Sequence, residues 1–300
     1  MGNFYLNLKN AARLINHNMS VPRMSSVIRK CWRVVRKETI ALPVVLRCKH
    51  CSRLPQKYLI VKASIKYDAA GNLRHDNWGD DMNIFFLQMI TGKTVLTLPE
   101  TAMARALRIK NYVCIGSTLT FWDMKDSIVW GSGILDTTIG LKFISKPAKI
   151  MAVRGPLSRK WALEQGVDCP EIYGDPILLL PDYYSPNVEK TGAIGVVPHY
   201  SDINDPVFDN LKKNDKVRFI PTREYDSWQA FVDAIVECSV IVSSSLHGLI
   251  VAYAYGIPAV WVKNKNKTDG WDTKFKDFYY SINLYNVKPY IFSGGGGCDT

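Results

Sequence analysis

Short apolar runs alternate with stretches of helical periodicity between residues 58 and 285. Runs rich in β-branched residues are typical of buried strands, and apolar residues that recur every three or four positions are typical of helices. The predicted strands cover 58–64, 111–116, 127–130, 149–153, 193–197, 217–220, 240–242 and 259–262, and the predicted helices cover 81–90, 156–165, 227–237 and 246–255.

This alternation predicts parallel sheets with helices on both faces. It occurs in two series around a linker at 182–192, so we expect an α/β fold with two Rossmann-like domains that face a cleft. In such sheets, ligands bind beyond the carboxyl ends of the strands. The predicted divisions are a basic N-terminal extension at 1–57, a first domain at 58–185, a second domain at 186–292 and a flexible tail at 293–300.

The charge of the chain is concentrated at its beginning. Twelve basic residues and one acidic residue, Glu38, precede Tyr58, so the first 57 residues carry the whole net charge of +11. Apolar residues recur at helical spacing over 4–19, and a second apolar set that includes Trp32 lies among basic residues over 27–37. A basic amphipathic segment with a Trp suits an anionic membrane surface. The alternative is a helix that packs on the body and leaves its charges in solvent. Nucleic acid is not expected as a partner, because the excess of basic residues ends where the folded body begins.

No stretch reaches the roughly 18 apolar residues that a membrane span needs, and the start of the chain lacks the order of a secretory signal. The seven cysteines are scattered, which is typical of a reducing compartment. We therefore expect a cytoplasmic protein held at the inner face of the membrane by its basic segment. Cys48, His50 and Cys51 are close in sequence, but no second ligand pair follows at useful spacing, so no metal site is expected.

The stretch SSSLHGLIVAYAYGIP at 243–258 links a predicted strand, a helix and the next strand. Ser244 or Ser245 is a natural N-cap, and His247 then lies in the first helical turn, where free amides and the helix dipole favour an anion. Gly248 allows close approach to the backbone. These residues form a candidate anion site at the cleft. The alternative is that the serines cap the helix and His247 is only a polar first-turn residue.

Other candidates also lie just beyond predicted strands. Arg154 could hold a carboxylate or phosphate with two parallel hydrogen bonds, or form a surface ion pair. Asn77 and Asp80 could bind sugar hydroxyls, although an acid at a helix start also has a purely structural explanation. His199 is a candidate at the mouth of the cleft, but a lone histidine is more often structural.

Taken together, these pieces resemble the polysaccharide pyruvyl transferase family. The matching segments are DNWGDDMN, VWGSGI, AVRGPLSRKWALEQG, YGDPILLLP, GVVPHY and VSSSLHGLIVAYAYGIP, and KFKDFYYS resembles the closing segment of the family. The resemblance implies a fold similar to the GT-B glycosyltransferases. It also implies transfer of the enolpyruvyl group of phosphoenolpyruvate to two sugar hydroxyls, which yields a cyclic pyruvate ketal.

The motifs of the family are carried over by position: its arginine after the central strand falls on Arg154, and its Leu-His-Gly falls on Leu246, His247 and Gly248. Many members have Arg before the Leu, where this chain has Ser245. This difference leaves one cation fewer for phosphoenolpyruvate. Arg223 and Lys263 are candidates to compensate for it.

We therefore predict a ketal pyruvyltransferase that acts on a sugar of a lipid-linked precursor of surface polysaccharide, with phosphoenolpyruvate as donor and no cofactor. His247 would donate a proton or stabilise the departing phosphate, and His199 or Asp80 would deprotonate the acceptor. Two alternatives stay open, a nucleotide-sugar glycosyltransferase of the same architecture and a non-catalytic glycan-binding member of the family. The predicted site residues are His247 and Arg154 for catalysis, these two with Ser244, Ser245 and Gly248 for donor binding, and Asn77, Asp80 and His199 for acceptor binding.

Overall fold

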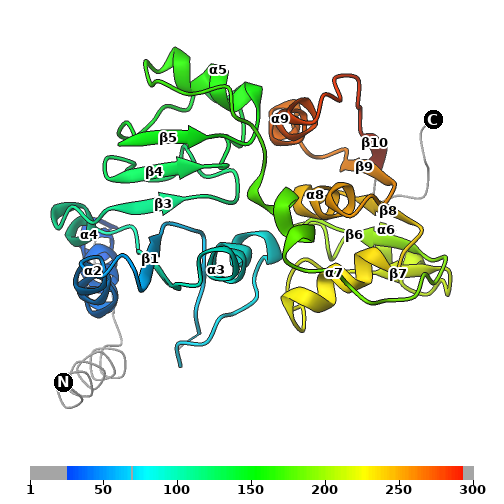
Figure 1. The fold of residues 1–300 in the computed structure, drawn as a ribbon, viewed down its shortest axis with the longest axis horizontal. Helices are drawn as coiled ribbons and strands as arrows, with labels where there is room; N and C mark the ends of the chain where they lie inside the picture. Colours follow the sequence, from blue (N-terminus) through cyan, green and yellow to red (C-terminus); the bar gives the residue numbers. More distant parts are fainter. Residues whose placement is uncertain (1–25, 69, 293–300) are drawn as a thin grey trace.

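The structure, a computed structural model, describes residues 26–68 and 70–292. The apolar stretch predicted at 4–19 and the tail predicted at 293–300 lie outside the described residues. Two parallel sheets of five strands each form the framework, one in each half of the described chain (Figure 1). The predicted α/β class with parallel sheets is confirmed.

The two sheets have the same topology. The first contains β1 (Tyr58–Val61), β2 (Thr94–Thr97), β3 (Asn111–Val113), β4 (Ser127–Trp130) and β5 (Lys149–Ala152) in the order β2-β1-β3-β4-β5. The second contains β6 (Ile194–Val197), β7 (Val217–Phe219), β8 (Val240–Ser243), β9 (Ala259–Asn264) and β10 (Tyr290–Phe292) in the order β10-β9-β8-β6-β7. In each sheet the winding direction reverses between the first and the third strand, and ligands of doubly wound sheets bind at such a switch point.

Helices connect the strands and cover the sheets (Figure 1). The α-helices are α2 (Ser26–Cys51), α3 (Trp78–Thr91), α4 (Ala102–Ala106), α5 (Pro156–Glu164), α6 (Val207–Leu211), α7 (Trp228–Val236), α8 (Leu246–Ala254) and α9 (Thr273–Ser281), and the 3-10 helices are η1 (Pro176–Asp182) and η2 (Asp269–Asp272). Every strand and helix that the sequence predicts is present, with ends shifted by at most three residues. The strands β2 and β10 and the helices α4, α6 and α9 were not predicted.

Helix α3 begins three residues earlier than the periodicity indicates. The reason is Asn77, whose side chain accepts a hydrogen bond from the amide of Gly79 at 3.2 Å and so caps the helix. Gly92 ends the helix in the left-handed conformation, with φ of 64°. The early start places Asp80 and Asp81 in the first turn of α3.

Helix α2 packs on the first sheet with its second half. Val45, Cys48 and Cys51 are buried there, and Glu38 accepts a hydrogen bond from the amide of Ala102 at 2.7 Å at the start of α4. The first half of α2 is exposed from Arg29 onward. The basic segment therefore has two parts, one anchored in the body and one with its charges and Trp32 in solvent.

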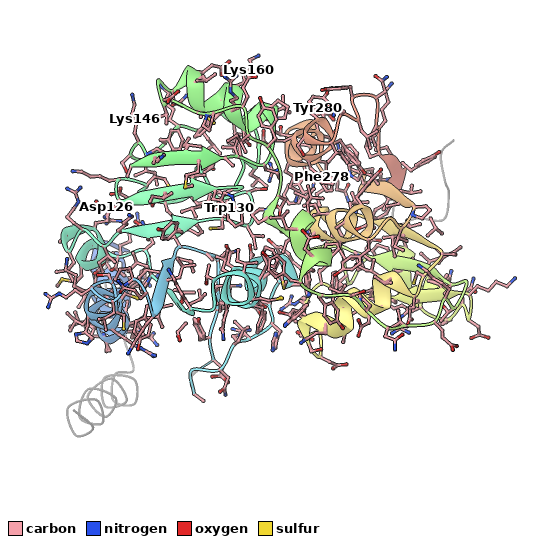
Figure 2. The ribbon with its side chains drawn as sticks, viewed as in Figure 1. Asp126, Trp130, Lys146, Lys160, Phe278 and Tyr280 are labelled. Carbon is pink, nitrogen blue, oxygen red and sulfur yellow. The ribbon has the colours of Figure 1, made fainter. Side chains whose placement is uncertain are left out.

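The largest apolar cluster joins the two sheets through α3, α7, α8 and α9. Trp78 of α3 stacks on Phe231 of α7 with ring centroids 4.5 Å apart, and its indole donates to the carbonyl of Trp228 at 3.1 Å. Phe278 of α9 is fully buried and its ring contacts Tyr253 of α8, whereas Lys160 on the outer face of α5 is exposed (Figure 2). This shared core holds the strand ends of the two sheets close together.

Candidate active site

The candidate residues gather at the switch points of the two sheets. Helix α3 begins beside the carboxyl end of β3, where a Cβ on Gly116 would lie 3.5 Å from a carboxylate oxygen of Asp80. In the second sheet, His199 follows β6 and Ser244 follows β8, and the amide of His199 donates to Oγ of Ser244 at 2.9 Å. Both switch points therefore contribute polar groups to one region.

His247 connects the two halves of this region. It lies in the first turn of α8, and its ring packs on Gly79 in the first turn of α3 so closely that a Cβ there would lie 1.8 Å from Nδ1. Ser245 occupies the predicted N-cap position but makes no capping hydrogen bond, while Ser244 donates to Asp202 at 3.0 Å. The first-turn amides of α8 therefore lack a side-chain cap and are suited to an anion.

His247 faces Asp175, which is the N-cap residue of η1. Nε2 of His247 lies 3.9 Å from Oδ2 of Asp175, and both atoms are buried without a hydrogen-bond partner. Burial lowers the pKa of His247 to about 3, with added repulsion from Arg154 and Lys274, and burial raises the pKa of Asp175 to about 6. Unsatisfied buried polar atoms are rare. The pair is thus placed to hydrogen-bond a third group, with His247 as a neutral imidazole.

Among these acids, Asp80 has the pKa closest to neutral pH. Burial and the adjacent Asp81 raise its pKa to about 7, against the hydrogen bond that Asn77 donates at 2.8 Å. The amide of Asn77 is thus used twice, because its oxygen caps α3 and its nitrogen holds Asp80. Asp81 points elsewhere and accepts a hydrogen bond from the hydroxyl of Tyr225 at 2.7 Å. Asp80 rather than Asp81 is therefore the candidate for proton transfer.

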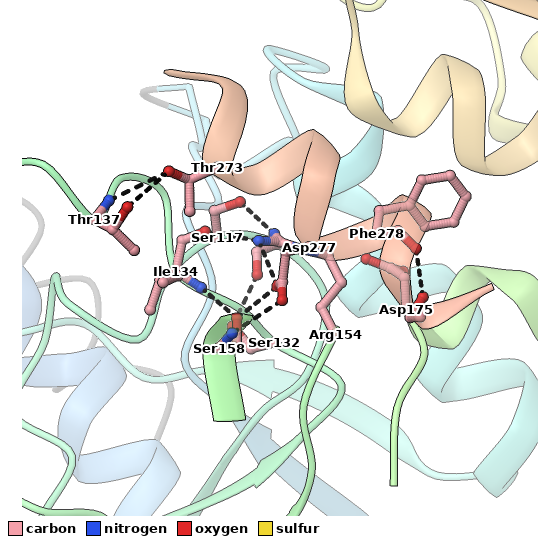
Figure 3. Close-up of polar contacts among 12 residues, drawn as sticks. Ser117, Ser132, Ile134, Thr137, Arg154, Ser158, Asp175, Thr273, Asp277 and Phe278 are labelled. Carbon is pink, nitrogen blue, oxygen red and sulfur yellow. Dashed lines mark hydrogen bonds and ion pairs between the residues drawn. The ribbon is translucent and has the colours of Figure 1, made fainter. Parts of the chain in front are cut away.

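Arg154 is fully buried and bound by protein groups on both terminal nitrogens (Figure 3). It donates to Ser117 at 2.5 Å and to the carbonyl of Ile134 at 2.7 Å, and it forms an ion pair with Asp277 at 3.0 Å. Asp277 also accepts hydrogen bonds from the amide and the hydroxyl of Ser158, at 2.9 and 2.6 Å, and so caps α5 from the other half of the chain. The surface ion pair considered for Arg154 is wrong. Its contact with a donor substrate stays a prediction.

His199 is enclosed by aromatic rings. It lies against Tyr200 and against Trp271, with ring centroids 4.2 and 5.1 Å apart, and its Nδ1 bonds the hydroxyl of Ser201 at 2.8 Å. Burial lowers its pKa to about 2, with repulsion from Lys274, Lys267 and His247. His199 is therefore neutral and close to the charges that surround His247.

Asp175, Lys274 and Asp277 are site residues that the sequence did not single out. They lie in the segments YGDPILLLP and KFKDFYYS, which matched the family without an assigned role. The only available signal was a polar residue inside an otherwise apolar or aromatic stretch. Since α9 belongs to the second half of the chain but packs on α5, no local pattern reveals that Asp277 meets Arg154.

Within residues 26–68 and 70–292, no group of three or more His, Cys, Asp or Glu side chains is placed to hold a metal ion. Cys48 and Cys51 are free thiols, and burial raises the pKa of Cys48 to about 12. Among the described helices, none combines the length and the apolar character needed to cross a membrane.

Comparisons with known proteins identify the family of this chain. The chain is 27% identical over 208 residues to the uncharacterised protein L143 of Acanthamoeba polyphaga mimivirus, an alignment that covers 67% of this chain and 69% of that protein. The family model described as polysaccharide pyruvyl transferase matches residues 106–266, which contain Arg154, Asp175, His199 and His247. As this match covers more than half of the chain, the protein belongs to the polysaccharide pyruvyl transferase family.

Proposed function

We propose that this protein transfers pyruvate from phosphoenolpyruvate to two hydroxyls of a sugar in a lipid-linked precursor of surface polysaccharide. The family supports pyruvyl transfer to a polysaccharide. The observation that carries the chemistry is the pairing, across Gly79, of an acid with a pKa near 7 and a neutral imidazole. Asp80 can give up a proton near neutral pH, and the neutral imidazole of His247 can accept one when a bound anion offsets the repulsion from Arg154 and Lys274.

The donor would be held at the N-terminus of α8. Phosphoenolpyruvate carries a carboxylate and a phosphate, and uncapped helix amides bind such groups. We assign donor binding to Ser244, Ser245, Gly248 and His247 in this turn. Arg154 lies close enough to lower the pKa of His247, and its positive charge would stabilise the developing negative charge of the departing phosphate.

The proposed reaction returns Asp80 and His247 to their starting protonation states. Asp80 protonates the methylene carbon of phosphoenolpyruvate while the first sugar hydroxyl attacks C2 and loses its proton to His247. The C2–O bond to phosphate breaks, and phosphate leaves with the proton held by His247. The second hydroxyl attacks C2 and returns a proton to Asp80. The products are the ketal and inorganic phosphate.

The acceptor would lie beside Asp80. Asn77 holds the carboxyl of Asp80 by a hydrogen bond. His199 follows β6 of the second sheet, and its ring lies against Trp271. We propose that Asn77 and His199 contact the sugar and that the ring of Trp271 offers it an apolar face. No cofactor enters this scheme.

The architecture and the basic helix support two further parts of the proposal. Two sheets of equal topology, joined at their carboxyl ends, support a GT-B-like arrangement. The exposed first half of α2 carries basic residues beside Trp32, Val34 and Val35, which supports binding to an anionic membrane surface. We therefore propose that the protein works in the cytoplasm at the inner face of the membrane, where lipid-linked glycans are available.

The test is incubation of the full-length protein with phosphoenolpyruvate and extracted lipid-linked glycans. We expect release of inorganic phosphate together with a pyruvyl ketal on the glycan, detected by mass spectrometry, and we expect both to be lost in Asp80→Asn. Glycosyl transfer from a nucleotide sugar without use of phosphoenolpyruvate would refute the proposal, as would glycan binding without any turnover.

A further inference from the structure

Arg223 and Lys263, the two cations first considered for the donor, are both next to acids. Lys263 is buried and forms an ion pair with Asp272 at 2.7 Å, and Arg223 lies 3.9 Å from Asp76. An acid therefore already offsets the positive charge of each.

Lys274, in the first turn of α9, has the properties that the two lack. Its side chain is buried, with an exposed fraction of 5% for the residue. Its ammonium lies 3.7 Å from the ring centroid of Trp271, and within the described residues it has neither an ion pair nor a hydrogen bond. The ammonium of this largely buried side chain is held only over the rings of Trp271 and Phe275, so it lacks protein acceptors for its three N–H donors.

Lys274 adjoins the candidate active site through Trp271, whose ring centroid lies 5.1 Å from that of His199. Its own pKa is lowered to about 7, first by burial and then by Arg154 and Lys267, while Asp202 and Asp80 act in the opposite direction. In turn, Lys274 lowers the pKa of both His247 and His199. Lys274 therefore lies among the groups that flank the uncapped start of α8.

Trp271 connects Lys274 with the start of α8. Trp271 and Ser244 line one narrow hollow, together with Lys263, Lys267 and Asp202. The ammonium of Lys267 lies 4.7 Å from the ring centroid of Trp271, but Lys267 is already paired with Asp202 at 3.3 Å. An anion placed between Trp271 and the start of α8 would therefore chiefly neutralise Lys274, and it would satisfy the free amides of the helix.

We propose that Lys274 binds the phosphate of the donor. The phosphate would lie between the ammonium of Lys274 and the first-turn amides of α8, and Lys267 would contribute at longer range. This inference rests on the proposed function, because it names the donor ligand within the same site. Lys274 lies outside the part of the chain that the family model matches.

The experiment compares Lys274→Met and Lys274→Arg with Lys276→Met, a control in the same helix whose lysine is half-exposed and near Asp272. The KM for phosphoenolpyruvate, kcat, and the Kd for inorganic phosphate by calorimetry are measured for each full-length protein. Loss of a charged hydrogen bond corresponds to about a 10- to 100-fold weaker interaction. We expect Lys274→Met to raise KM and the phosphate Kd by about this factor, Lys274→Arg to recover most of it, and Lys276→Met to leave both unchanged.

The outcomes separate this inference from the proposed function. If the wild type turns over phosphoenolpyruvate and Lys274→Met keeps KM and the phosphate Kd within twofold, the role of Lys274 is refuted. If the wild type shows no turnover, the proposed function fails, while a phosphate Kd that depends on Lys274 still supports the anion site. Equal phosphate binding by the wild type and Lys274→Met overturns the anion site in either case. A kcat effect that Lys274→Arg does not reverse, with KM unchanged, would also contradict binding.

Discussion

Replacing Asp277 by Ala should remove a large part of the stability of this protein. Asp277 and Arg154 are both fully buried and lie 3.0 Å apart, and the same carboxylate caps α5 through the amide of Ser158. Removing one partner of a buried ion pair costs about 3–5 kcal/mol, because the other charge is left without a partner. Losing the cap adds about 1 kcal/mol. The sum of about 4–6 kcal/mol is comparable with the whole stability of many domains.

Urea denaturation followed by tryptophan fluorescence measures this loss. The matched control is Glu164→Ala, which removes the partner of the exposed Lys160 at 3.9 Å and should cost only about 0.3–0.5 kcal/mol. The double variant Arg154→Met with Asp277→Ala removes the unpaired charge as well, so it should be more stable than Asp277→Ala alone. An Asp277→Ala protein as stable as Glu164→Ala, or a double variant less stable than the single one, would refute this reasoning.

Three further predictions follow from the site and from α2. Gly79→Ala places a Cβ 1.8 Å from Nδ1 of His247, so kcat should fall by about 100-fold. Adding His247→Ala to this variant should cause little further loss of kcat. Additive losses would show that the two residues act separately. Burial raises the pKa of Asp80 to about 7, so its contribution to stability is complete below pH 4 and is lost as the pH rises through about 7. Urea denaturation at several pH values should therefore show a steeper fall for the wild type than for Asp80→Asn, and parallel curves would contradict the raised pKa. Finally, the exposed changes Trp32→Ser and Arg33→Glu should weaken flotation with anionic liposomes without changing the melting temperature, whereas unchanged flotation would exclude α2 as the membrane contact.

The sequence was most informative where one physical pattern dominates a segment. The strand β4 was predicted with the bounds that the structure has, because SIVW is a compact apolar run between polar residues. By contrast, β2 and β10 are short edge strands of four and three residues. Their position depends on pairing with β1 and β9, and the local residue pattern does not reveal this pairing. Position at an edge alone does not hide a strand, because β5 and β7 also lie at sheet edges and were predicted.

The candidate site was predicted in part for the same reason. His247, Arg154 and His199 follow strands, so their positions at the carboxyl edge follow from the fold class. The residues that contact these three side chains do not follow from the fold class. The hydrogen bond from Tyr225 to Asp81, rather than residue type, distinguishes Asp80 from its neighbour as the candidate proton donor, and burial leaves Lys274 without an acceptor. Such properties come from packing between segments that are distant in sequence.

The bond between Arg154 and Asp277 also constrains how the protein can be made. More than one hundred residues separate the two along the chain. At a synthesis rate of about 5–20 residues per second, Arg154 leaves the ribosome roughly 6–25 s before its partner exists. During that interval the first sheet can neither neutralise this charge nor cap α5. The first half of the chain therefore stays incompletely folded, and accessible to aggregation and to chaperones, until α9 is synthesised and Asp277 pairs with Arg154.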